Sequence, residues 1–129
     1  MTKRFSVAVV ELMFLGLGAC SGDGSRVTPA QACSQLVTGN CVKMIECFDP
    51  AELAMLGITD QASCEAWAEP QLASRAGGSC SNATTTNLCE DANAVFYPEQ
   101  VDTCVSEVAA LSCADFINGT DSVCTLICQ

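Results

Sequence analysis

The residues best able to do chemistry in this chain are its eleven cysteines. Cysteine thiolates can bind zinc, exchange with disulfides or pair into structural bonds. The chain has no histidine and no Cys-x-x-Cys pair, so the usual zinc ligand sets are missing. Structural disulfides are therefore the first interpretation, with metal binding and a framework containing one reducible pair as alternatives. Ten cysteines follow Cys20: Cys33, Cys41, Cys47, Cys64, Cys80, Cys89, Cys104, Cys113, Cys124 and Cys128.

Other groups are weaker candidates for catalysis or metal binding. Glu90 and Asp91 are neighbours in a polar stretch, where such carboxylates are usually just solvated. Asp91-Ala92-Asn93 lacks the glycine and the distant glutamate of a calcium loop. Lys43 is expected on the polar side of its helix, with no serine placed to use it as a base. The sequence predicts no catalytic residue, no metal and no cofactor.

A basic start and an apolar run precede Cys20. The run from Phe5 to Leu17 is interrupted by Glu11 and is too short to span a bilayer. Small residues follow it, as a signal peptidase requires. The stretch Leu17-Gly18-Ala19-Cys20 resembles the lipobox of bacterial lipoprotein signal peptides. An ordinary secretory signal and an uncleaved N-terminus are the alternatives.

The lipobox resemblance implies a membrane anchor at Cys20. In that family residues 1–19 are removed, and the cysteine carries diacylglycerol on its sulfur and usually an acyl chain on its new N-terminus. Two or more acyl chains hold a protein on a bilayer essentially permanently. A residue other than Asp after the cysteine, here Ser21, usually permits transfer to the outer membrane in enterobacterial lipoproteins. The expected location is the cell envelope, in the outer rather than the inner membrane.

The remaining chain divides into a tether and one small domain. Residues 20–28 form the lipidated cysteine and a flexible tether with a reach of about 15 Å. Residues 29–129 then have the length of one small domain. Only Arg26, Lys43 and Arg75 are basic after Cys20, in a chain with 15 carboxylates. Such a surface should repel nucleic acid and anionic lipid headgroups.

Cys20 also changes the cysteine count from odd to even. In an exported protein, ten remaining cysteines indicate five disulfides. The small core needs such covalent help, because aromatic residues make up only 5% of the chain. Each native bond typically contributes about 2 to 4 kcal/mol.

Start signals and helical periodicity predict three helices in the first half of the domain. Thr28-Pro29-Ala30-Gln31 starts a helix from Pro29 to Phe48, with a weak point at Gly39-Asn40. A second helix is predicted from Pro50 to Leu56. Thr59 or Asp60 caps a third, which Pro70 ends or kinks.

The second half reads as a loop followed by further helices. Residues 77–94 are predicted to be a loop fixed by Cys80 and Cys89. Pro98 starts a helix with an apolar stripe from Val101 to Leu111, and Ser112 caps a short one that follows. One or two helical turns are expected in residues 121–129. No strand pattern is present, so the fold class is all-α: a small disulfide-rich domain of about four to five short helices.

The spacing on the first helix limits the pairing of its cysteines. Cys33 and Cys41 lie about 12 Å apart along the axis, and Cys41 and Cys47 about 9 Å, too far for bonds between them. Each must pair with another element, which makes this helix the hub. Cys104 and the C-terminal cysteines are expected partners. Ten cysteines allow about 945 connectivities, so the pairing stays open.

The cysteine spacing also resembles that of a group of bacterial proteins. A lipobox, Cys33, Cys41-x5-Cys47, the lone cysteine of Ser63-Cys64-Glu65-Ala66-Trp67 and the late Leu111 to Phe116 stretch are similar to the cysteine-rich lipoproteins of myxobacteria. The resemblance implies a disulfide-stapled helical module at the cell envelope, without catalytic residues to transfer.

Two functions follow from these observations. The first is a non-enzymatic binding or structural module, anchored in the membrane through Cys20, with an envelope or extracellular protein as partner and no nucleic acid. The alternative is a thiol-disulfide protein using Cys124 and Cys128, although their spacing differs from the Cys-x-x-Cys of redox families.

Overall fold

The computed structural model describes residues 26–89, 91, 93–119 and 123–129. Within these residues no strand forms, and the only β pairing is an isolated antiparallel bridge between Phe96 and Cys128. The prediction of a disulfide-rich all-α domain is confirmed. Its α-helices are α1 (Pro29–Cys47), α2 (Pro50–Met55), α3 (Gln61–Leu72), α4 (Val101–Ala110) and α5 (Cys113–Ile117). Short 3-10 helices are η1 (Ser74–Ala76), η2 (Cys80–Asn82), η3 (Pro98–Gln100) and η4 (Val123–Leu126).

Helix α1 begins where the sequence predicts. The Thr28 hydroxyl accepts a hydrogen bond from the Gln31 N–H at 3.2 Å, and the Gln31 side chain accepts one from the Thr28 N–H at 3.0 Å. This reciprocal pair satisfies two N–H groups that the helix leaves without partners. The helix then passes through Gly39-Asn40 without a break, and the Asn40 amide donates to the Leu36 carbonyl at 2.8 Å.

Local caps also fix the N-terminal starts of the next two helices. Asp49 caps α2 together with Glu52. Asp60 caps α3, and hydrogen bonds from the backbone N–H and the hydroxyl of Ser63 hold the pKa of its carboxyl below the usual value. Helix α3 contains Pro70 in its last turn and ends two residues later at Leu72. The first turn of a helix needs such acceptors, because its N–H groups have no partners within the helix.

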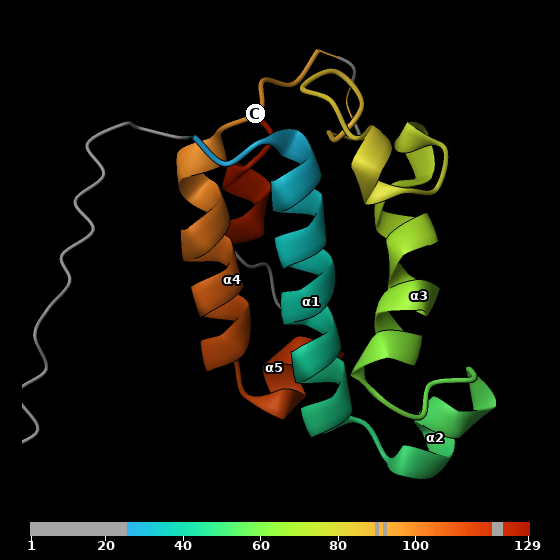
Figure 1. Ribbon diagram of the computed structural model, residues 1–129. Coiled ribbons are helices and arrows are strands. Elements are labelled where there is room, and N and C mark those ends of the chain that lie inside the picture. The colour runs from blue at the N-terminus through green and yellow to red at the C-terminus, as the bar shows by residue number, and fades with distance from the viewer. Residues whose placement is uncertain (1–25, 90, 92, 120–122) are drawn as a thin grey trace, which may run out of the picture.

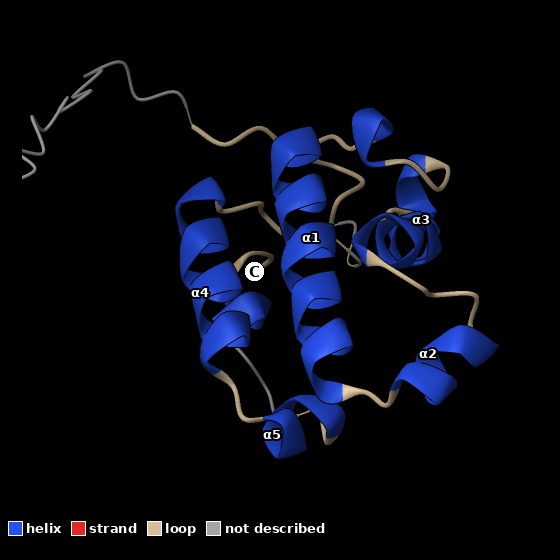
Figure 2. Cartoon of the chain, turned by 60° about the horizontal axis from the view of Figure 1, so that its bottom comes forward, coloured by secondary structure: helices blue, strands red, loops and turns tan. Residues whose placement is uncertain are grey.

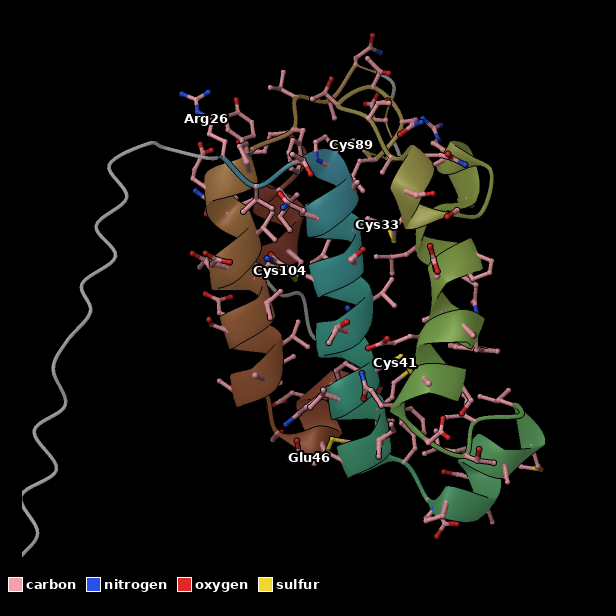
Figure 3. All side chains as sticks on the ribbon, in the orientation of Figure 1. Arg26, Cys33, Cys41, Glu46, Cys89 and Cys104 are labelled. Carbon is pink, nitrogen blue, oxygen red and sulfur yellow. A yellow bond between two sulfur atoms is a disulfide. The ribbon has the colours of Figure 1, made fainter. Side chains whose placement is uncertain are left out.

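Helix α1 lies between α4 and α3, and both pack against it (Figure 1). Helices α2 and α5 sit at the end where α1 finishes, as both views show (Figures 1 and 2). Arg26, labelled in Figure 3, and the C-terminus, marked in Figure 1, lie at the other end. The predicted role of α1 as the hub is therefore confirmed.

Two clusters of buried side chains lie on different sides of α1. The cluster toward α3 contains Cys33, Val37 and Cys41 of α1. The cluster toward α4 contains Ala32 of α1, with Leu36 packed against it. Each cluster buries side chains of α1. A core therefore forms on two sides of α1 without close packing between α3 and α4.

Gly39 permits the close approach of α1 and α4. A Cβ atom placed on Gly39 would lie 3.2 Å from Cγ1 of Val105, which is tighter than ordinary contact. Glycine in a helix interior costs about 1 kcal/mol relative to alanine. The close packing of Val105 explains why this residue is accommodated in the middle of α1.

We predict that Gly39→Val separates α1 from α4 and lowers the free energy of unfolding by about 1 to 3 kcal/mol, the usual cost of overpacking. Guanidinium unfolding of the oxidised domain, followed by circular dichroism, measures the change. Ser34→Val serves as the control, because Ser34 is exposed on the same helix. Equal stability of the two variants would contradict a tight contact at Gly39.

Candidate functional site

All ten cysteines of the domain are paired. Three bonds connect α1 to other parts of the chain, and two lie in the second half. The pairs are Cys33–Cys80, Cys41–Cys64, Cys47–Cys113, Cys89–Cys128 and Cys104–Cys124. Four of the half-cystines are labelled in Figure 3.

Helical geometry explains where the α1 cysteines go. With 3.6 residues per turn, Cys41 is rotated by only about 80° from Cys33, and both face the cluster shared with α3. Cys47 is rotated by about 120° from Cys41 and reaches α5 instead. The expectation that Cys104 and the C-terminal Cys124 and Cys128 would pair with α1 is wrong. Because η4 lies against α4, Cys124 pairs with Cys104, and Cys128 pairs with Cys89.

The pairing also bears on the alternatives raised by the sequence. Cys124 and Cys128 belong to two different bonds, so they do not form the reducible pair considered for redox chemistry. Thiolate ligation of a metal has no free thiol to use among residues 33–128 of the described chain. The carboxylate of Glu46 lies within 4.8 Å of both sulfurs of Cys47 and Cys113, but bonded sulfurs lack the thiolate that a metal requires.

The other predicted positions are also accounted for. Cys20 and the lipobox lie outside the described residues, as does Glu90. Asp91 accepts a hydrogen bond from the Asn93 N–H at 2.8 Å, which closes a turn. The loop of residues 77–94 is fixed through Cys80 and Cys89 as predicted.

Lys43 is not on the polar side of α1 as expected. Its side chain is only 4% exposed, and Nζ lies 3.2 Å from both carboxylate oxygens of Glu46 and 3.3 Å from the Ala109 carbonyl oxygen. The contact with Ala109 places the lysine against α4, while Glu46 stays 58% exposed. The burial of this cation leaves Arg26 and Arg75 as the exposed basic residues of the described chain.

From Gln31 to Ile45 the outward side of α1 is a long surface without charge. Its residues recur at three- and four-residue spacing and are all exposed: Gln31, Ser34, Gln35, Thr38, Val42 and Ile45. We call this surface the α1 face. Val42 is 53% exposed although it is apolar.

A groove runs beside the α1 face, between α1 and α4. Its volume is about 400 Å³, and the α4 side of it is formed by Val105 and Ala109. A second hollow lies on the other side of Ser34 and Gln35, toward Glu69 and Cys80. The α1 face is therefore a ridge with a hollow on each side.

Two carboxylates of α3 border the α1 face. Glu65 accepts a hydrogen bond from the Thr38 hydroxyl at 2.9 Å. Glu69 accepts bonds from the Cys80 N–H at 2.7 Å and from the Ser79 hydroxyl at 3.1 Å, which fixes the start of η2. Neither carboxylate has a cationic partner among the residues with described positions.

Sequence reasoning missed this surface, although one signal for it was present. From Val27 to Val42 the chain carries no charged residue, in spite of its 15 carboxylates. Such a run indicates an uncharged stretch of helix. It does not show whether the rest of the domain buries that stretch or leaves it exposed. Glu69 had no comparable signal, because its hydrogen-bond partner Cys80 is 11 residues away.

Comparisons with family models, curated proteins and solved structures found no match for this chain. None of the helices in the described part of the chain has the length and hydropathy needed to span a bilayer. The geometry of the disulfides and of the α1 face is therefore the basis for a functional proposal.

The five disulfides differ in their exposure to solvent. Both half-cystines are partly exposed in Cys47–Cys113, whereas each of the other four bonds has at least one fully covered partner. Since thiol-disulfide exchange requires access to a sulfur, the exposed bond should react first.

We predict that mild reduction of the folded domain opens Cys47–Cys113 before any other bond and leaves the helices in place. Alkylation followed by peptide mass mapping identifies the released thiols, and far-ultraviolet circular dichroism reports the helix content. Release of thiols from Cys124 and Cys128 first would show that exposure does not control the order.

Proposed function

We propose that this chain is a non-enzymatic, lipid-anchored module of the cell envelope that binds a partner protein. The observation that carries the proposal is the α1 face, an exposed and uncharged helix surface on a disulfide-braced scaffold. A surface with a charge-depleted centre and a polar rim is the common anatomy of a protein interface. The lipobox at Leu17-Gly18-Ala19-Cys20 supports the anchor.

The arrangement of the ends agrees with anchoring through the N-terminus. Arg26 lies at the end of the domain where α1 begins, and Glu46 lies toward the opposite end (Figure 3). Helix α1 has 19 residues and so is about 28 Å long. A tether attached near Arg26 would hold that end toward the membrane and leave the length of α1 accessible.

The disulfides support a binding role because they fix α1, the helix that carries the α1 face. Cys33 and Cys41 tie α1 to η2 and α3. The surface thus loses little conformational entropy when a partner binds, which favours affinity.

We predict that Cys20→Ser moves the protein from the membrane fraction to the soluble fraction and removes its labelling by radioactive palmitate. The physical reason is the loss of the acyl chains that hold a lipoprotein on the bilayer. Cell fractionation and metabolic labelling in the native host test this result, with Ser21→Ala as the control that retains the cysteine. The anchor would be refuted if the parent protein carried no palmitate label and Cys20→Ser stayed in the membrane fraction.

We also expect a photoreactive residue at Gln35 to crosslink the anchored protein to a defined envelope or extracellular partner. The same residue placed at Met55, which is 80% exposed on α2, samples a different surface. Mass spectrometry of the crosslinked bands identifies the partners. Absence of a specific band from both positions would contradict the binding role.

A further inference from the structure

We infer that the α1 face is a docking surface for one amphipathic α-helix of a partner protein, with small apolar residues at its centre and lysine or arginine along its edges. This inference rests on the proposed function and names the chemical class of the partner.

The shape of the surface fits a helix. The α1 face extends from Gln31 to Ile45, which is about 21 Å along the helix axis, or about four turns. The groove between α1 and α4 runs beside it, and a helix laid in such a groove packs its side chains between those of the two helices. An added β-strand would need an exposed sheet edge, and the described residues form no sheet.

The centre of the surface favours apolar contacts. Val42 is exposed on α1, and Val105 and Ala109 form the opposite wall of the groove. Gly39 also lines the groove, where a Cβ atom on it would lie 3.2 Å from Cγ1 of Val105. Small side chains of a partner can therefore approach the helix backbone without removing a charge from water.

The edges of the surface favour a cationic partner. Glu65 and Glu69 line the α3 side, one helical turn apart and without a cationic partner in the described chain. Asp102 continues the row of Val105 and Ala109 on α4, and Glu46 follows Val42 by one turn on α1. Lys43 of α1 is buried against Ala109 and pairs with Glu46, so it offsets Glu46 but not Glu65, Glu69 or Asp102.

The same charges disfavour two other occupants. A second copy of this chain would bring its own Glu65 and Glu69 toward those of the first, and the chain has a net charge of −10. An anionic membrane surface would be repelled for the same reason. A basic helix is the occupant that satisfies both the apolar centre and the acidic edges.

The test uses the oxidised domain and a synthetic peptide of about four helical turns, with alanine and leucine on one side and lysine along both flanks. Val42→Arg places a cation in the centre of the α1 face. Ile117→Arg makes the same charge change on α5, where Ile117 is 52% exposed. Both residues are exposed, so both variants should keep the helix content of the parent.

We expect Val42→Arg to weaken peptide binding at least about tenfold, measured by calorimetry, and Ile117→Arg to weaken it less than about twofold. A peptide of the same composition in scrambled order should bind weakly to all three proteins. Equal losses in the two variants, or equal binding of the scrambled peptide, would show only general attraction between opposite charges and overturn the inference. Failure of the parent domain to bind the ordered peptide would also overturn it.

Nuclear magnetic resonance of the unmodified domain gives a second readout that needs no variant. Peptide-induced shifts should concentrate on Ser34 to Ile45 and on Val105 and Ala109. Shifts centred on α2 or α5 would show that the peptide binds elsewhere. A doubling of the domain's mass in solution without peptide would show that a second copy occupies the α1 face.

These outcomes are separable from failure of the proposed function. Crosslinking of a partner from Met55 but not from Gln35 would leave the binding role intact and place its surface elsewhere. Absence of crosslinks from both positions would count against the binding role itself.

Discussion

The structure depends on the three disulfides that connect α1 to other elements. A helix advances about 1.5 Å and turns about 100° per residue, so cysteines eight and six residues apart cannot reach one another. Cys33 and Cys41 point to η2 and α3, while Cys47 points to α5. One helix is therefore fixed covalently to elements on different sides of it. The other two bonds, Cys89–Cys128 and Cys104–Cys124, hold the second half of the chain together.

These bonds compensate for a core that is small and has few aromatic rings. Fully buried positions are mostly cysteine, alanine and valine, and the described aromatic pair Phe48–Phe116 lies near the end of α1. The apolar area that such residues remove from water is limited. Gly39 contributes in a different way, because it lets Val105 of α4 approach α1 closely. Close packing and covalent bonds together replace the large side chains that a bigger domain would bury.

The burial on both sides of α1 also decides which surface stays open. One side faces α3, another faces α4, and the remaining arc forms the α1 face. Lys43 falls on the α4 side, where its stem is covered and its charge meets Glu46. From Gln31 to Ile45 the exposed arc carries no charge, while the carboxylates of α3 lie along its edge. The protein is thus acidic overall but uncharged along this one ridge.

The amino-acid sequence by itself determined the parts of the structure that depend on near neighbours. Thr28 with Gln31, Asp49 with Glu52, and Asp60 with Ser63 form caps across three residues, so the starts of α1, α2 and α3 were predictable. Helical periodicity likewise predicted the all-α class, and the even number of cysteines after Cys20 predicted the disulfide framework.

Only the tertiary structure decided the pairing of the cysteines, whose partners lie 20 to 66 residues apart. It also decided that Lys43 is buried, that Gly39 lies under Val105, and that the uncharged ridge of α1 remains open. The physical reason is the range of the interactions. A cap is satisfied within one helical turn, whereas a bond partner or the exposure of a side chain depends on which distant element packs beside it.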